Sequence, residues 1–252
     1  MTDSATRPRV DASPLVLVIF DCDGVLVDSE RLAVRTEVEV LAELGWPLEE
    51  REVIERFVGR SPVYMQAAIE RQLGRPIDFD RLFMQRHEEV FERELRAVDG
   101  VVALLDALEV PICVASSGTH ERIRRSLELV GLADRFEGRV FSASDVARGK
   151  PAPDLFFHAA ATMGVAPARC AVVEDSVPGV EAGCAAGMSV FAFGGGVTDP
   201  AALARPGVTV VESMHELIAL LAPWGAQRPG AGTSTSTLAV SRRTPGGIEG
   251  SW

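Results

Sequence analysis

Short apolar runs alternate with helical patterns along most of the chain. Residues 15–20 (LVLVIF) form an unbroken apolar run, which is typical of a strand buried on both faces of a parallel sheet. Comparable runs occupy residues 111–116, 140–142, 170–173, 189–193 and 208–211, and helical patterns occupy residues 99–108, 119–130, 153–163, 178–186 and 214–221. Strands and helices in alternation predict an α/β fold with a doubly wound, mainly parallel sheet.

One stretch, residues 32–95, breaks this alternation and contains no convincing strand. Val34, Val38 and Leu41 recur there at helical spacing, and Ser61-Pro62 has the composition of a helix cap followed by a first turn. An all-helical insert between the first and second strands accounts for this pattern. We therefore expect a small helical domain that sits over the sheet.

The chain accordingly divides into three parts. Residues 1–31 and 98–224 are expected to form the α/β core, residues 32–97 a helical cap, and residues 225–252 a flexible tail. The last segment is rich in Gly, Ser, Thr and Pro and has no hydrophobic periodicity, so it cannot bury enough apolar surface to become ordered.

The net charge limits the partners. Acidic residues number 36 against 25 basic ones, a formal charge of −11 at pH 7, so the field of the protein repels phosphate backbones and anionic lipid. We expect neither nucleic acid nor a membrane as partner, and we expect a monomer or a weak homodimer. The hydrophobic fraction of 47% and the charged fraction of 24% are those of an ordinary globular protein.

The cysteines and the first residues bear on the cellular compartment. Cys22, Cys113, Cys170 and Cys184 are scattered without CxxC spacing, so we expect reduced, structural thiols. Residues 1–14 are polar and lack the apolar segment of a signal peptide, and no apolar run approaches the roughly 20 residues that a membrane span requires. These features favour a cytoplasmic protein.

Lysine is used once in the whole chain. The 25 basic residues are 24 arginines and Lys150. A compact ammonium and a planar guanidinium are not interchangeable. The arginine bias therefore indicates that Lys150 occupies a position where an ammonium is required, although a solvated surface lysine is the alternative.

Polar residues follow the expected strands where each strand ends. Asp21 and Asp23 follow the first strand, Ser116-Ser117-Gly118 the second and Glu174-Asp175 the fourth, while Lys150 opens the segment before a helix. Ligands of open α/β sheets bind at the carboxyl ends of the strands. The sequence therefore predicts that these acids, hydroxyls and the amine face one crevice.

Simpler interpretations exist for each motif alone. Asp-x-Asp-Gly fits an ordinary turn, and Ser116-Ser117-Gly118 fits a helix N-cap, although the same groups could hold an anion at a helix N-terminus. Two acid pairs at one crevice are harder to explain as turns, because converging carboxylates repel unless a cation lies among them. Oxygen ligands without His or Cys indicate a hard ion, and Mg²⁺ fits best since it accepts carboxylates together with a substrate phosphate.

Four ordered motifs carry a family resemblance. They are Asp21–Ser29 (DCDGVLVDS), Val114–Gly118 (VASSG), Gly149–Asp154 (GKPAPD) and Val172–Gly179 (VVEDSVPG). Together they resemble the motifs of haloacid dehalogenase-like (HAD) hydrolases, in the branch of helical-cap phosphatases and β-phosphoglucomutases, and the match spans roughly residues 15–222. Any one motif would be a weak signal, but four in the right order with the cap in the right gap are specific.

The resemblance implies a role for each acid. Asp21 would be the nucleophile that forms an aspartyl-phosphate, and Asp23 the general acid and then the general base. Mg²⁺ would be held by Asp21, the backbone carbonyl of Asp23 and Asp175, with Glu174 as a further candidate ligand. A covalent carboxylate intermediate divides the displacement into two steps, which agrees with general expectation.

The resemblance also implies a phosphate site and a substrate class. Ser116 and Lys150 would bind the phosphoryl oxygens, assisted by Ser117 and Gly118, and the cation would neutralise charge on the transferring group. The expected activity is Mg²⁺-dependent hydrolysis of a small phosphorylated metabolite, a sugar or polyol phosphate. Arg60 lies in a cap stretch, FVGRS, that resembles the substrate-specificity loop of the family, and a solvated arginine is the alternative.

Relatives with other chemistry fit less well. Dehalogenases use the aspartate without a metal, which the Glu174-Asp175 pair argues against, and phosphonatases need a cap lysine, which is absent from residues 32–97. β-Phosphoglucomutases carry a cap-hinge histidine and a cap arginine where Ala33 and Pro62 stand here. Transfer to a sugar therefore remains the alternative to transfer to water.

A signalling receiver domain is a more remote alternative. It also uses a phosphorylatable Asp, an acid pair, a hydroxyl and a Lys on a doubly wound sheet, and it acts as a switch without a small substrate. Receivers are about half as long as this chain and have no cap, so we favour the enzyme.

Overall fold

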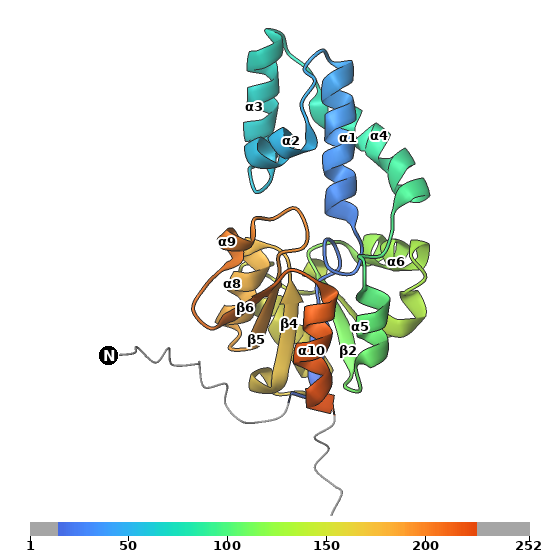
Figure 1. Ribbon diagram of the computed structural model, residues 1–252, viewed down its shortest axis with the longest axis vertical. Coiled ribbons are helices and arrows are strands. Elements are labelled where there is room, and N and C mark those ends of the chain that lie inside the picture. The colour runs from blue at the N-terminus through green and yellow to red at the C-terminus, as the bar shows by residue number, and fades with distance from the viewer. Residues whose placement is uncertain (1–14, 226–252) are drawn as a thin grey trace, which may run out of the picture.

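The core is a six-stranded, all-parallel sheet in the order β3-β2-β1-β4-β5-β6 (Figure 1). The structure, a computed structural model, describes residues 15–225. The strands are β1 (Leu17–Phe20), β2 (Ile112–Ser116), β3 (Val140–Ser142), β4 (Cys170–Glu174), β5 (Ser189–Phe193) and β6 (Val208–Val211). The predicted doubly wound α/β fold is thus confirmed.

Helices cover both faces of this sheet. They are α5 (Val101–Ala107), α6 (His120–Leu129), α7 (Asp154–Thr162), α8 (Val177–Ala185), the short α9 (Pro200–Leu203), which the hydrophobic pattern does not predict, and α10 (Met214–Gly225). Val18 and Phe20 pack with α5, α6 and α10, whereas Leu17 and Ile19 pack with α7 and α8. All four residues of β1 are buried, which explains the unbroken apolar run.

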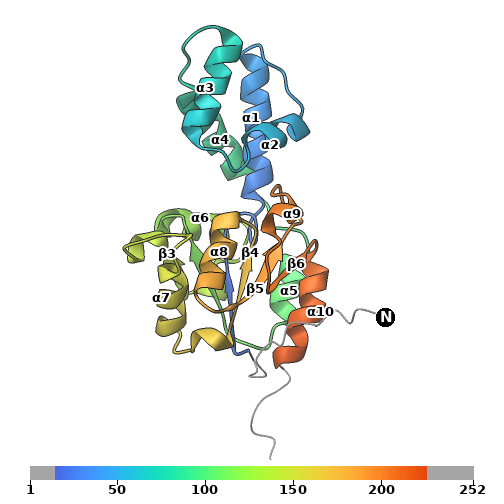
Figure 2. The same ribbon diagram turned by 90° about the vertical axis from the view of Figure 1, so that its left-hand side faces the viewer.

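Four helices form a cap beyond the carboxyl ends of the strands (Figures 1 and 2). They are α1 (Ser29–Glu43), α2 (Glu50–Phe57), α3 (Pro62–Leu73) and α4 (Phe79–Glu94). Their apolar faces build a cluster of their own around Leu41, Val53 and Ile69. The Ser61 hydroxyl accepts a hydrogen bond from the backbone N–H of Tyr64 at 3.2 Å, with Pro62 in the first turn, as the sequence predicts.

The first cap helix begins earlier than the sequence pattern indicates. Helix α1 starts at Ser29, three residues before the expected start of the cap at residue 32. The N-cap is Asp28, whose side chain makes no capping hydrogen bond, and the Ser29 hydroxyl donates to Asp23 Oδ1 at 2.7 Å. Because the first turn is polar, the hydrophobic pattern does not show this start.

Two crossing segments join cap and core. Val27 and Ala97 form an antiparallel bridge, the Asp28 N–H donates to the Arg96 carbonyl at 2.9 Å, and the Val98 N–H donates to the Leu26 carbonyl at 3.1 Å. The chain therefore leaves the core and returns to it at one place.

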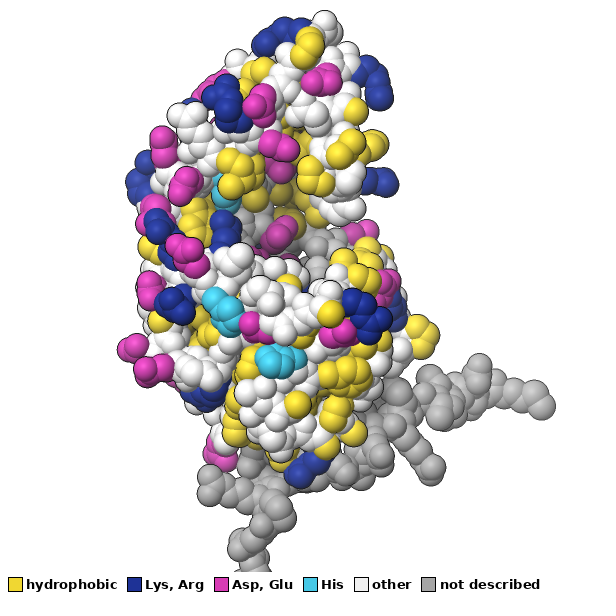
Figure 3. All heavy atoms as spheres, turned by 180° about the vertical axis from the view of Figure 1, so that it is seen from behind, with side chains coloured by type: hydrophobic (Ala, Val, Ile, Leu, Met, Phe, Trp, Pro, Cys, Tyr) yellow, Lys and Arg dark blue, Asp and Glu magenta, His cyan; other side chains and the backbone are white. Residues whose placement is uncertain are grey.

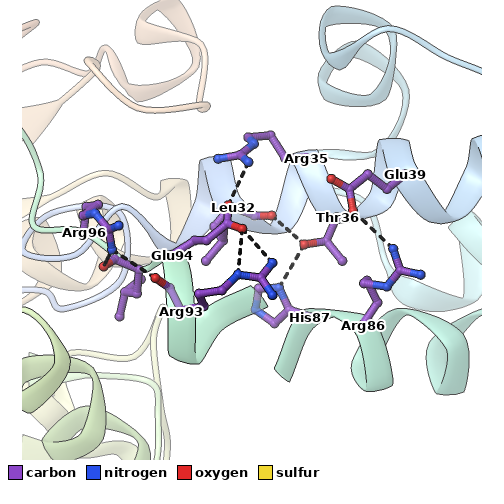
Figure 4. A network of polar contacts seen from close by, with 10 residues as sticks. Leu32, Arg35, Thr36, Glu39, Arg86, His87, Arg93, Glu94 and Arg96 are labelled. Atoms are coloured by element: carbon purple, nitrogen blue, oxygen red, sulfur yellow. Dashed lines mark hydrogen bonds and ion pairs between the residues drawn. The ribbon is translucent and has the colours of Figure 1, made fainter. Parts of the chain in front are cut away.

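Helices α1 and α4 pack side by side and share polar contacts (Figure 4). Arg35 pairs with Glu94 at 2.9 Å on the exposed side, where an ion pair contributes little. Inside, the Thr36 hydroxyl donates to the Leu32 carbonyl at 2.8 Å and lies 3.5 Å from His87 Nδ1. Packing rather than charge therefore holds this pair of helices together.

Some expectations concern other regions. The predicted tail lies outside the described residues, apart from Gly225, which ends α10. The four cysteines are free thiols, and three of them are buried. Within residues 15–225, no helix combines the length and the apolar character needed to cross a membrane.

Candidate active site

Most of the predicted site residues meet in a cleft between core and cap. Because β1 lies between β2 and β4, Asp21 after β1, Ser116 at the end of β2 and Glu174 at the end of β4 are neighbours. Lys150 reaches the same point from the loop before α7. The cleft has a volume of about 1170 Å³, and Figure 3 shows the hollow with acidic side chains inside it.

Lys150 is the centre of the cleft floor. Its Nζ donates to Asp21 Oδ1 and to Glu174 Oε1 at 2.5 Å each, and to the Ala115 carbonyl at 3.0 Å. Only 4% of the side chain is exposed. Burial alone would lower the pKa of Lys150, but the two carboxylates outweigh it and raise this pKa above its ordinary value. Lys150 is therefore a charged ammonium with all three protons in use.

Glu174 is fully buried and fully hydrogen-bonded. Its Oε1 accepts from Lys150, and its Oε2 accepts from the Ser176 N–H at 3.0 Å and the Ser176 hydroxyl at 2.8 Å. A Cβ on Gly179 would lie 1.8 Å from Glu174 Cδ, so this glycine leaves room for the carboxylate. These contacts make Glu174 a support for Lys150.

Three carboxylates gather around the ammonium. Asp21, Glu174 and Asp175 each offer an oxygen, and these atoms lie within 4.8 Å of one another. Burial, together with the charge of Glu174, raises the pKa of Asp21 to about 7 despite Lys150, and burial raises the pKa of Asp175 as well. One ammonium cannot balance three charges, and an all-oxygen donor set suits a hard divalent cation, so the residues fit Mg²⁺.

Gly24 allows Asp175 to approach the first loop. Its φ of +75° is in the left-handed region, and a Cβ there would lie 1.8 Å from Asp175 Oδ2. The glycine of the Asp-x-Asp-Gly motif is therefore required for both backbone conformation and space.

Asp23 stands apart from this cluster. It is half-buried, lines the cleft, and accepts a hydrogen bond from Ser29 rather than from Lys150. The two acids of the motif thus have different surroundings, which general acid catalysis next to a nucleophile requires.

The second motif is arranged around a buried hydroxyl. Ser116 Oγ accepts from the Gly118 N–H at 3.2 Å, so the chain itself uses this amide. Ser117 lines the cleft, whereas Gly118 does not. Thr119, rather than either serine, is the N-cap of α6 and accepts from the Arg122 N–H at 3.3 Å.

The cap side of the cleft differs from the expectation. Val58 and Gly59 line it, but the neighbouring Arg60 is exposed and its guanidinium lies 5.7 Å from the ring centre of Tyr64. The structure thus does not bring Arg60 to the cleft.

Among the lining residues that sequence reasoning missed are Phe83, Met84 and His87 from α4 and Arg122 from α6. The signal for Arg122 is its place in the first turn of the helix that follows the serine motif. The three α4 residues give no signal of this kind, because helical spacing describes a packed face equally well.

Comparisons with known proteins agree with this geometry. Residues 15–187 match the model of haloacid dehalogenase-like hydrolases. The chain is 34% identical over 210 residues to 6-phosphogluconate phosphatase of Escherichia coli, covering 81% of this chain and 94% of that protein. It is 34% identical over 184 residues to hexitol phosphatase A of E. coli, covering 69% and 81%.

A solved structure is similar as well. The HAD family hydrolase from Deinococcus radiodurans, crystallised with bound phosphate and sodium, is 35% identical with a TM-score of 0.76, covering 84% of this chain and 97% of that one. The family model and the phosphatase relatives together show that the chain belongs to the phosphatase branch of the haloacid dehalogenase-like hydrolases.

Proposed function

We propose that this phosphoric monoester hydrolase is Mg²⁺-dependent and releases phosphate from a small sugar or polyol phosphate through an aspartyl-phosphate. The observation that carries the proposal is the buried cluster of Asp21, Glu174 and Asp175 around Lys150 on the floor of a roofed cleft. We propose the division into an α/β core and a helical cap on the separate apolar clusters of the two parts.

The first step uses Asp21 and Asp23. A carboxylate oxygen of Asp21 attacks phosphorus while the bond from phosphorus to the leaving alcohol breaks. Asp23 gives its proton to the departing oxygen, and its place on the cleft wall, outside the Lys150 cluster, suits this role. Asp21 then carries the phosphoryl group.

The second step restores both acids. Water gives a proton to Asp23 and its oxygen attacks phosphorus, which breaks the bond to the Asp21 oxygen and releases inorganic phosphate. Lys150 keeps Asp21 in place and, since its three protons go to protein acceptors, acts on the phosphoryl group through its charge, while the Ser116 hydroxyl faces the phosphoryl oxygens. Asp21, Asp175 and the backbone carbonyl of Asp23 would hold Mg²⁺, which when bound neutralises charge on the transferring group.

The relatives support the substrate class and the residues support water as acceptor. One relative is named for 6-phosphogluconate and another for hexitol phosphates, so phosphorylated sugar acids and polyols are the compounds to test first. Ala33 lines the cleft without a titratable group, and Pro62 begins α3. These positions therefore lack the side chains that the mutase alternative needs.

The test is phosphate release by purified protein from sugar, sugar-acid and polyol phosphates and from nucleotides. We expect turnover of sugar-type esters with Mg²⁺, none in excess chelator, and recovery when Mg²⁺ is restored. Acid quenching during turnover should trap phosphate on wild-type protein but not on Asp21→Asn. Full activity in excess chelator, or turnover confined to nucleotides, would overturn the proposal.

A further inference from the structure

Arg122 presents a guanidinium without an acidic partner to the cleft. It stands in the first turn of α6, half-buried, and its side chain lines the cleft. Within residues 15–225, no carboxylate lies within ion-pair distance of it and no side-chain or backbone acceptor takes its guanidinium protons. Its contact is the ring of Phe91 in the cap, whose centre lies 4.4 Å from the guanidinium carbon.

The charges that line the cleft make this guanidinium unusual. Seven lining residues are acidic: Asp21, Asp23, Glu30, Glu55, Glu174, Asp175 and Asp199. Among the described lining residues, Lys150 and Arg122 are the permanently charged cations. Lys150 donates all three of its ammonium protons to acceptors on the floor. A second anionic group on a substrate therefore has Arg122 as its one free cationic partner on the described cleft wall.

Arg122 stands where the core meets the cap. It belongs to α6 of the core, but its guanidinium contacts the ring of Phe91 in the cap helix α4, and that ring lies 5.6 Å, centre to centre, from His87, which also lines the cleft. Because the proposed nucleophile Asp21 holds the phosphoryl group on the floor of the core, the rest of the substrate extends toward the cap. Arg122 is therefore on the path of the leaving-group portion.

The contact with Phe91 leaves the guanidinium ready for a ligand. A cation over an aromatic face is held in orientation, and the N–H groups on its edge stay available. These groups form a fork that matches a carboxylate with two parallel hydrogen bonds, which a neutral hydroxyl cannot reproduce.

We propose that Arg122 binds a carboxylate on the leaving-group portion of the substrate, so that the enzyme prefers phosphorylated sugar acids to polyol phosphates, whose leaving-group portion is uncharged. This inference rests on the proposed phosphatase function and names its substrate class.

A matched pair of esters tests it. 6-Phosphogluconate and glucitol 6-phosphate differ at C1, where one has a carboxylate and the other a hydroxymethyl group. Wild type should have the higher kcat/KM on the acid. Arg122→Met, which keeps an unbranched side chain against Phe91, should lower kcat/KM for the acid about thirtyfold, mainly through KM, and change the polyol less than threefold. Arg122→Lys should recover part of the loss.

Controls separate this role from others. Arg124→Met, an exposed substitution on the same helix outside the cleft, should leave the ratio between the esters unchanged. An equal fall on both esters in Arg122→Met would assign Arg122 to holding the cap, and no fall on either would assign it no role; each result would overturn the inference.

Binding keeps the inference separate from the proposed function. Calorimetry in the Asp21→Asn background measures affinity without turnover. If wild type hydrolyses neither ester, the proposed substrate class fails, but selective loss of 6-phosphogluconate affinity on Arg122→Met would still support the carboxylate subsite. Equal affinities for the two esters, or no affinity for the acid, would refute it.

Discussion

The floor and the roof of the cleft are built on different principles. On the floor, Lys150 and Glu174 have every hydrogen-bonding group engaged, and their partners come from strand β2 and from the loops that follow β1 and β4. The roof is the side of the cleft that the cap forms. Its helix α4 carries a row of four rings whose successive centres lie 6.2, 5.0 and 5.6 Å apart, namely those of Phe79, Phe83, His87 and Phe91. Charged hydrogen bonds hold the floor together, whereas contacts between aromatic rings hold the roof together.

This difference predicts different effects of substitutions in the two parts of the cleft. Buried, fully satisfied polar networks are rigid, and removing one member leaves the others unpaired. Apolar surfaces tolerate substitution at lower cost, because the contacts are non-directional. Substitutions on the floor should therefore abolish reaction, whereas substitutions on the roof should adjust which ester is preferred.

The largest effect is expected from Asp21→Asn. The amide keeps the shape of the side chain but is no nucleophile, so phosphate release should fall to below about 1% of wild type, roughly the scale of a lost essential group. Circular dichroism should be unchanged. Asp134→Asn, an exposed control, should retain full activity. Substantial turnover by Asp21→Asn would place the nucleophile elsewhere.

Lys150→Arg should cost slightly less. A guanidinium is wider than the space between Asp21, Glu174 and the Ala115 carbonyl, so one partner must move. We expect kcat/KM to fall by at least ~100-fold, as for loss of one electrostatic contact in a site, with little change in Tm. Arg148→Lys, whose parent side chain is exposed and paired with Asp154, should be neutral. Near wild-type kinetics in Lys150→Arg would show that the reaction does not require an ammonium at this position.

The pH dependence of stability should report the crowded charges. Because the pKa of Asp21 is raised to about 7 from an ordinary 3.8, the folded protein holds this proton more tightly than the unfolded chain. This contribution is fully present below about pH 4 and is lost as pH rises through about 7. Without metal, raising the pH from 5 to 8 should lower the Tm of wild type by roughly 5 °C relative to the Tm of Asp21→Asn.

Metal provides the control for this measurement. Mg²⁺ at pH 8 should raise the Tm of wild type more than that of Asp21→Asn, since the ion replaces the missing positive charge. A constant difference in Tm across the pH range would show that Asp21 ionises without cost.

A pair of glycines tests the space on the floor. Gly24 and Gly207 both have positive φ, but a Cβ meets Asp175 only at the first and nothing within 4 Å at the second. Gly24→Ala should raise the Mg²⁺ concentration for half-maximal activity at least tenfold, whereas Gly207→Ala should cost only roughly 1–2 kcal/mol of stability. If Gly24→Ala and Gly207→Ala required the same Mg²⁺ concentration, Asp175 would not be a metal ligand.

The smallest effect is expected on the roof. Met84 lines the cleft and is 54% exposed, so Met84→Ala should change KM for a sugar phosphate about threefold with little change in kcat, the size of a modest apolar contact. Val63→Ala, on the exposed surface of the cap away from the cleft, should change neither constant. A large loss of kcat in Met84→Ala would contradict the division between floor and roof.

The same division explains what the sequence could predict. Asp21, Ser116 and Glu174 follow directly from apolar runs that end abruptly, because parallel strands bring their carboxyl ends to one edge. His87 lies on the amphipathic helix α4, where a residue that lines a cleft has the same helical spacing as a residue packed in a core. The start of α1 was also missed, because its first turn is polar and the apolar helical spacing begins only at Leu32.

The paired crossing segments have a consequence for how such enzymes can be altered. The insertion leaves through Leu26–Asp28 and returns through Arg96–Val98, and the two are hydrogen-bonded to each other on the core side. Any replacement whose ends lie as close together can be spliced there without changing the register of a single strand. Recombination at these two segments would therefore exchange the cap as one unit and leave the strands and the Lys150 cluster of the core in place, with a donor to Asp23 in the position of Ser29 as the one requirement on the new segment.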